Sequence, residues 1–151
     1  MEALLSVSLD QIVADVFETM LGRPVSEIDP SWMSDADRLT AAVHFAGESA
    51  GALLLECSKA HACLLAEMLT GIPHLRVDED VLDALAELTN MIGGNLKSAL
   101  HGGAGLSMPT VVEGSDYSMR IRGANPSQRT GFSCQDACFS VTFVSERRKR
   151  R

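Results

Sequence analysis

The chain has few aromatic residues and no long apolar run. Aromatics make up 5% of its 151 residues against 46% for all hydrophobic residues, so the core must consist of Leu, Val, Ile, Ala and Met. No apolar run approaches the ~18 residues of a membrane-spanning helix, and the start lacks the basic and apolar segments of a secretory signal. We therefore expect a cytoplasmic protein without membrane insertion.

Positive charge is scarce outside the last five residues. The formal net charge is −7, and because residues 147–151 carry +5, the remainder carries −12. An acidic body excludes a nucleic-acid groove, which needs clustered positive charge. We expect residues 1–146 to form a single domain and residues 147–151 to be a disordered basic tail, although such a tail is also able to touch an acidic partner, a membrane surface or nucleic acid.

Metal-ligating and reactive side chains are scattered. The spacings of Cys57, Cys63, Cys134 and Cys138 fit no standard zinc pattern. If the last pair lies on one strand, the two thiols share a face but lie well apart. We interpret all four as structural thiols, with a metal or disulfide at the last pair as the alternative. The histidines are scattered too and fit packing or surface roles, so we expect no metal site.

The order of helical and extended patterns predicts an α+β fold. Ser8 and Ser58 are suited to cap two helices that end at Gly22 and Gly71. Strand patterns occupy 39–45 and 52–57, joined by a turn at 47–51, and return at 106–112, 117–122 and 138–144. Residues 26–37 and 125–127 read as loop and turn. This order favours helices packed on one face of an antiparallel sheet. The buried residues are expected at Ile12, Val13, Val16, Phe17 and Met20 in the first helix and at Cys63, Leu64, Met68 and Leu69 in the second.

A third and longer helix is expected from Asp78 or Asp80 to about Leu100. One narrow stripe of apolar residues must face the core. Asn90 falls opposite this stripe, with Asp83 and Glu87 beside it on the outer face. Spacing alone indicates only an exposed polar patch, since acids and amides on an outer helix face are usually solvated. The stripe consists of Val81, Leu85, Leu88, Ile92, Leu96 and Ala99.

Two adjacent glycines interrupt this helix. Gly93 and Gly94 each cost ~1 kcal/mol of helix stability relative to alanine, so we expect a reason for them. A surface without side chains beside Asn90 would let another molecule approach the amide closely. Tight packing or helix fraying is the alternative.

Residues 83–100, DALAELTNMIGGNLKSAL, resemble a helix of the CheC, CheX and FliY phosphatases of bacterial chemotaxis, which carries the motif D/S-x3-E-x2-N. Residues 106–112, LSMPTVV, resemble the strand that follows this helix in the family. CheC-type members have a second motif copy on an earlier helix. Neither earlier helix here contains E-x2-N, which indicates the single-site CheX type. The stretch from Asn90 to Pro109 is a few residues shorter than the family pattern.

The resemblance implies a CheC-like fold and a phosphatase that acts on the aspartyl phosphate of a CheY-like response-regulator receiver. It implies that Asn90 orients the attacking water and that Glu87 pairs with a receiver lysine. Gly93 and Gly94 are expected to face the partner, and Asp83 is expected either to contact the partner as well or to support the helix surface. By the same resemblance, we expect the chain to need no cofactor of its own, because magnesium belongs to the receiver, and to form a homodimer like its CheX-type relatives.

Two other classes remain open from the sequence. One is a non-catalytic adaptor that binds a receiver or a flagellar-switch protein. The other is a dimerisation module, which is compatible with catalysis. A metal or thiol enzyme is the remote alternative, because the scattered histidines and cysteines form no recognisable site.

Overall fold

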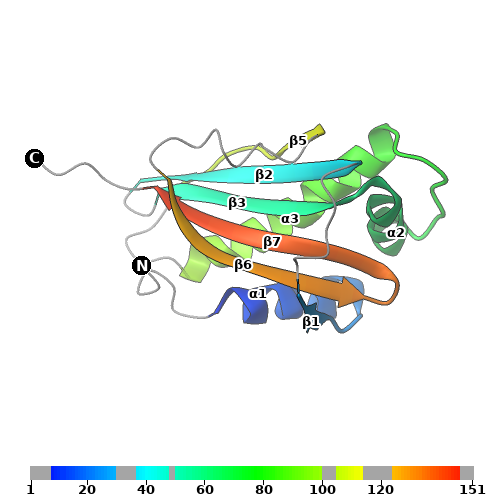
Figure 1. Cartoon of the computed structure of the whole chain (residues 1–151), viewed down its shortest axis with the longest axis horizontal. Helices are drawn as coiled ribbons and strands as arrows, with labels where there is room; N and C mark the ends of the chain where they lie inside the picture. The colour runs from blue at the N-terminus through cyan, green and yellow to red at the C-terminus, as the bar shows by residue number, and fades with distance from the viewer. Residues whose placement is uncertain (1–7, 30–36, 48–49, 100–104, 114–123, 147–151) are drawn as a thin grey trace, which may run out of the picture.

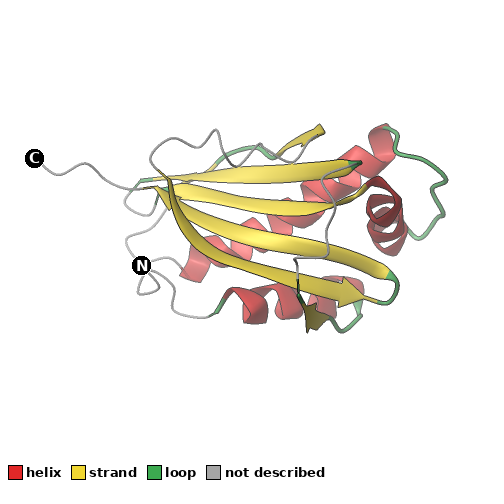
Figure 2. Cartoon of the chain, in the orientation of Figure 1, coloured by secondary structure: helices red, strands yellow, loops and turns green. Residues whose placement is uncertain are grey.

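The computed structural model describes residues 8–29, 37–47, 50–99, 105–113 and 124–146. Within them, three α-helices lie on one face of a seven-stranded antiparallel sheet (Figures 1 and 2). This confirms the predicted α+β class. The strands follow the order β1-β6-β7-β3-β2-β4, and β5 also pairs with β2. The elements are α1 (Leu9–Val16), the π-helical turn η2 (Phe17–Leu21), β1 (Ser26–Ile28), β2 (Arg38–Ala46), β3 (Gly51–Ser58), α2 (Lys59–Thr70), α3 (Glu79–Ala99), β4 (Gly105–Leu106), β5 (Thr110–Glu113), β6 (Ala124–Cys134) and β7 (Ala137–Glu146).

The main core fills the space between the helices and the sheet. Alternate residues of each long strand point into it, because side chains of a strand alternate between the two faces. Phe139 of β7 is central, stacking on Phe17 at 5.2 Å and on Phe132 at 5.5 Å between ring centroids. The inward residues of the three central strands are Leu39, Ala41, Val43, Phe45, Leu53, Leu55, Cys57, Phe139, Val141 and Phe143.

The first helix begins as predicted and ends differently. Ser8 is the N-cap, and its hydroxyl accepts a hydrogen bond from the Gln11 backbone N–H at 3.4 Å. The chain then widens into the π-helical turn η2, which changes the rotation per residue. Met20 therefore leaves the buried stripe and is 60% exposed, so its predicted burial is wrong. Gly22 closes the turn at φ +67°, a conformation that favours glycine.

The second helix is capped as predicted, but its buried face is rotated. The Ser58 hydroxyl accepts from the His61 backbone N–H at 3.2 Å, and Gly71 ends α2 at φ +80°. Cys63 is buried as expected. Leu64, Met68 and Leu69 are only partly buried. The fully buried residues are Ala62, Cys63, Leu65 and Ala66.

Three strand predictions need correction. Residues 125–127 were expected to be a turn, yet they lie inside β6, where the register with β7 shifts between Asn125 and Gln128. A β-bulge accommodates a proline that an ordinary strand would not. The predicted loop at 26–37 contains β1, and the predicted strand at 106–112 is divided into β4 and β5. The predicted strand at 117–122 lies outside the described residues.

The last two cysteines flank a hairpin turn. Cys134 pairs with Ala137, and Ser133 pairs with Cys138, so the turn consists of Gln135 and Asp136. The two thiols therefore lie on different strands and opposite faces of the sheet, so the condition for a shared face, a single strand holding both, is not met. Cys134 is fully buried in the main core. All four cysteines are free thiols.

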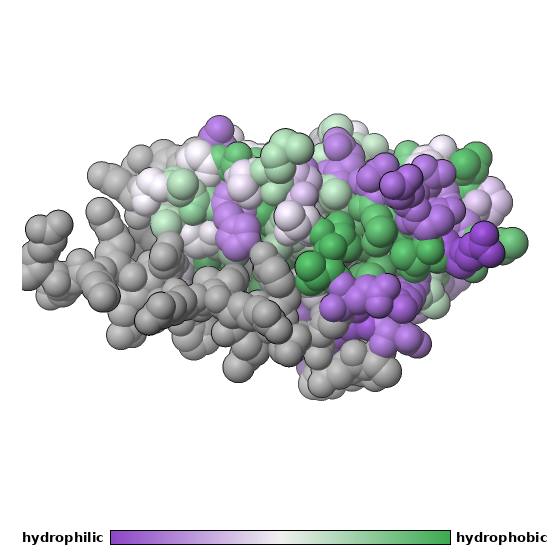
Figure 3. All heavy atoms as spheres, turned by 90° about the horizontal axis from the view of Figure 1, so that it is seen from above, coloured by the Kyte–Doolittle hydropathy of each residue, from purple (hydrophilic) through white to green (hydrophobic). Residues whose placement is uncertain are grey.

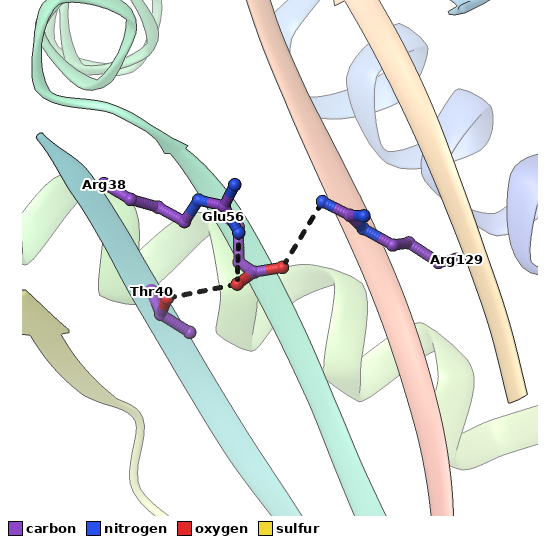
Figure 4. A network of polar contacts seen from close by, with 4 residues as sticks. All are labelled: Arg38, Thr40, Glu56 and Arg129. Carbon is purple, nitrogen blue, oxygen red and sulfur yellow. Dashed lines mark hydrogen bonds and ion pairs between the residues drawn. The ribbon is translucent and has the colours of Figure 1, made fainter. Parts of the chain in front are cut away.

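The sheet face away from the helices carries a buried ion-pair network (Figure 4). Glu56 of β3 lies between Arg38 of β2 and Arg129 of β6, with guanidinium-to-carboxylate distances of 3.4 Å and 4.0 Å. The Thr40 hydroxyl donates to the same carboxylate at 3.4 Å. Glu56 and Arg38 are 5% and 8% exposed. The ion pairs satisfy charges whose burial would otherwise be costly.

Candidate functional site

The helix α3 starts from a well-defined cap. The Asp78 carboxylate accepts a hydrogen bond from the Val81 backbone N–H at 3.1 Å, which fixes the first turn. Glu79 and Asp80 follow in that turn, where the helix dipole favours negative charge. The helix therefore begins within the predicted interval.

The predicted apolar stripe of α3 faces the core along its whole length. Each of the six stripe residues is at most 7% exposed. The buried face is broader than predicted, because Ala84, Thr89 and Gly93 are buried as well. The Thr89 hydroxyl donates to the Leu85 carbonyl at 2.8 Å, which satisfies the polar group inside the core. This packing holds α3 rigidly against the sheet.

The candidate site lies on the opposite side of the same helix. Asp83 and Glu87 are exposed, and Asn90 is partly buried one turn further along. Among the described residues, none offers a hydrogen bond or ion pair to these three side chains. Two carboxylates and one free carboxamide therefore point away from the core on a helix that packing holds in place. A carboxamide supplies both donors and an acceptor, so it is able to hold a water molecule.

The two glycines of α3 have different surroundings. Gly94 is partly exposed, and a Cβ atom there would meet nothing within 4 Å. Gly93 is buried, and a Cβ atom there would lie 2.8 Å from Val43 Cγ2 and 3.5 Å from Leu106 Cδ1. The open surface expected beside Asn90 is thus found at Gly94, whereas Gly93 packs on the sheet. We call the contact of Gly93 with Val43 and Leu106 the helix seat.

A serine between β4 and β5 adds two hydrogen bonds to β2 at the sheet edge beside α3. The Ser107 backbone N–H donates to the His44 carbonyl at 2.9 Å, and its hydroxyl accepts from the His44 N–H at 2.9 Å. Ser107 thereby joins β2 in the gap between the pairings of β4 and β5. Sequence reasoning missed Ser107, Val43 and Leu106 because they contact α3 or β2 across long sequence separations that no periodicity reports.

Hydrophobic side chains form a patch on the side of the molecule where β5 and α3 meet. Figure 3 looks onto this side and shows the patch between two hydrophilic groups. Val111 of β5 and Leu82 of α3 are partly buried hydrophobic residues that pack against the main core. Met108, in the link between β4 and β5, is 83% exposed. Apolar surface of this kind marks protein interaction sites.

The described residues contain no group of three or more His, Cys, Asp or Glu side chains arranged to hold a metal ion. Within the same residues, no helix has both the length and the apolar composition needed to span a membrane.

Comparison with solved structures identifies the fold. The chain is similar to the chemotaxis protein CheX from Vibrio vulnificus, with a TM-score of 0.74 and 20% identity over 91% of this chain and 93% of that one. It is similar to CheX in the CheX–CheY–BeF3–Mg2+ complex from Borrelia burgdorferi, with a TM-score of 0.72 and 19% identity over 92% of this chain and 96% of that one. It also resembles Thermotoga maritima FliY, with a TM-score of 0.65 and 17% identity over 91% of this chain and 84% of that one. No curated protein matches the sequence.

The chain therefore has the fold that these CheX and FliY structures share. A family model narrows the assignment. Residues 39–134 match the model described as chemotaxis phosphatase CheX, so the chain belongs to the CheX family. The matched range includes α3 and every candidate site residue.

Proposed function

We propose that this protein removes phosphate from the aspartyl phosphate of a CheY-like receiver domain. The observation that carries the proposal is the free carboxamide of Asn90, which points outward from a rigid helix in a member of the CheX family. The Borrelia CheX of similar fold forms a complex with CheY, BeF3 and Mg2+, which supports a CheY-like partner for this chain as well.

Asn90 is the group that acts on water in this mechanism. Its carboxamide enters the receiver site and orients a water molecule in line with the bond between phosphorus and the aspartyl oxygen. The water oxygen bonds to phosphorus, the phosphorus–aspartyl bond breaks, and the receiver carboxylate and inorganic phosphate are released. Both water protons leave with the inorganic phosphate, and the aspartyl oxygen keeps the electron pair of the broken bond. A neutral amide suits this position because phosphoryl transfer depends on positioning, and a carboxylate there would repel the phosphate.

Glu87 is the docking group. Its exposed carboxylate lies one turn from Asn90 and pairs with a lysine of the receiver, which fixes the register of the complex. Asp83 extends the same acidic surface towards the helix start, and Gly94 leaves the space beside Asn90 open to the partner. Magnesium belongs to the receiver, so the chain supplies no metal ligand.

We also propose that the protein acts in the cytoplasm as a homodimer, the state that the sequence resemblance implies. Analytical ultracentrifugation of the full chain measures this directly. A monomer at micromolar concentration would reject the dimer and leave the catalytic proposal intact, because every proposed site residue comes from one chain.

The test of the proposed function is a panel of phosphorylated receivers from the source genome. Each receiver is followed for loss of its acyl phosphate with and without this protein. We expect at least one to lose phosphate faster in its presence. Binding to a receiver without any acceleration would instead support the non-catalytic adaptor.

A further inference from the structure

The structure predicts opposite effects on stability when each of the two adjacent glycines of α3, Gly93 and Gly94, is replaced by alanine. Alanine stabilises a helix relative to glycine wherever there is room for its methyl group. Gly94 has that room, with nothing within 4 Å of an added Cβ. Gly93 has none, since the added atom would lie 2.8 Å from Val43 Cγ2. The backbone of α3 therefore approaches the sheet at Gly93 more closely than any side chain allows.

The side chains of the helix seat, Val43 and Leu106, have little freedom to move away from Gly93. Val43 is fully buried, and its β-branched side chain has restricted rotamers. It lies in β2, where it pairs with Leu53 of the neighbouring β3. Leu106 pairs with Phe45 of β2, and the two hydrogen bonds of Ser107 to His44 hold the next residue in place. An added methyl group at Gly93 must therefore displace the helix.

Asn90 lies on the turn of α3 that precedes Gly93. A displacement at the helix seat consequently changes the height and rotation of the Asn90 carboxamide relative to the sheet edge and to the earlier turn that carries Glu87. A docked partner that touches Glu87 and the sheet edge at Met108 would then meet Asn90 in a different place. In-line attack depends on this position, and a misplacement of about 1 Å costs roughly 100-fold in rate.

We propose that Gly93 is a positioning residue, which sets the place of Asn90 by letting α3 lie directly on Val43. This inference rests on the proposed function, since the position of Asn90 matters only if Asn90 acts on the receiver. Gly93 itself is buried on the face of α3 that packs on the sheet, so it is not accessible to a partner. A substitution at Gly93 should therefore lower the maximal rate and leave the affinity for the receiver nearly unchanged.

The test uses four variants of the full chain: Gly93→Ala, Val43→Ala, the double variant, and Gly94→Ala. Gly94→Ala serves as the stability control and should raise the unfolding midpoint. Gly93→Ala should lower that midpoint and reduce the rate at saturating phosphorylated receiver by about 10-fold or more, with a KM changed by less than about threefold. Val43→Ala removes both γ-methyl groups, including the Cγ2 atom that a Cβ at Gly93 would meet, so the double variant should recover the rate of Val43→Ala alone.

Rescue separates positioning from general destabilisation. Two unrelated destabilising changes add, so the double variant would then be worse than either single variant. A double variant as slow as Gly93→Ala, or a Gly93→Ala protein with an unchanged rate, would overturn the inference. If Gly93→Ala fails to fold, the inference is tested by comparing the rate of the double variant with that of Val43→Ala alone. Equal rates support the inference, and a slower double variant overturns it.

A structural measurement keeps this result distinct from failure of the proposed function. If the wild-type protein accelerates no receiver, the proposed function fails, and the helix seat is then tested by crystal structures of Gly93→Ala and of the double variant. The inference predicts that Asn90 moves relative to β2 in the first and returns in the second. An unmoved Asn90 in Gly93→Ala would refute it.

Discussion

Asn90 and Asn95 lie on the same helix, but only Asn95 uses its carboxamide within that helix. Asn95 Nδ2 donates to the Met91 carbonyl at 2.9 Å. The Asn90 side chain makes no hydrogen bond or ion pair to the part of the chain that the structure describes. The two residues are therefore a matched pair, in which one amide serves the helix and the other is available to a partner.

The first prediction concerns the stability of this pair. Asparagine is a poorer helix former than alanine by about 0.5 kcal/mol. Asn90→Ala loses no hydrogen bond and should raise the free energy of unfolding by about that amount, whereas Asn95→Ala should gain less because its bond to Met91 is lost. Urea denaturation of both variants measures this. A clear destabilisation by Asn90→Ala would show that the amide has a structural role.

The second prediction concerns docking through Glu87. Replacing the carboxylate by the amide in Glu87→Gln removes its charge and should raise the KM for the phosphorylated receiver about fivefold, the equivalent of about 1 kcal/mol. The maximal rate should change little, and the salt dependence of KM should weaken. Glu67→Gln, on the exposed side of α2, is the control. Equal KM values for the two variants would exclude Glu87 as the docking group.

The third prediction concerns the network in Figure 4. Glu56→Ala removes the buried carboxylate that pairs with Arg38 and Arg129 and accepts from Thr40, and it should destabilise the fold by about 3–5 kcal/mol. Glu113→Ala is the control, because its ion pair with Lys59 at 3.6 Å is exposed and contributes less than about 1 kcal/mol. Chemical denaturation compares them. Similar losses for both would mean that burial does not strengthen the network.

The fourth prediction concerns alkaline pH. Burial raises the pKa of the Cys57 thiol to about 12, with smaller contributions from Cys63 and Glu56. The folded state then holds this proton more tightly than the unfolded state, so the contribution to stability is complete below about pH 9 and is lost as pH rises towards 12. Cys57→Ala should show a shallower decline of unfolding free energy over this range. If the unfolding free energies of wild-type protein and Cys57→Ala fall in parallel between pH 9 and 12, the raised pKa of Cys57 is contradicted.

Local rules predicted much of what the structure contains. Ser8 and Ser58 cap their helices, and the apolar period of α3 identifies its buried stripe, because both signals lie within one helix. Met20 was misplaced because a π-helical turn breaks the period used to place it. The bulge at residues 125–127 was misread because its proline is typical of turns as well.

The site was predictable only in part. Periodicity places Asp83, Glu87 and Asn90 outside the core, and the resemblance alone supplies a reaction. The difference between Gly93 and Gly94 has no local signal, because it depends on Val43, which is distant in sequence. The pairing of Glu56 with Arg38 and Arg129 likewise requires the order of the strands. Contacts between segments that are distant in the sequence therefore could not be predicted from local patterns.

The most direct test of the central claim is the decay of the acyl phosphate on the cognate receiver, measured with wild-type protein and with Asn90→Ala. Removing one group that stabilises a transition state typically costs 100-fold or more, so Asn90→Ala should return the decay nearly to the rate of the receiver alone. Asn95→Ala should retain most of the acceleration, and Asn90→Ala should still bind the receiver. Undiminished acceleration by Asn90→Ala would contradict the account.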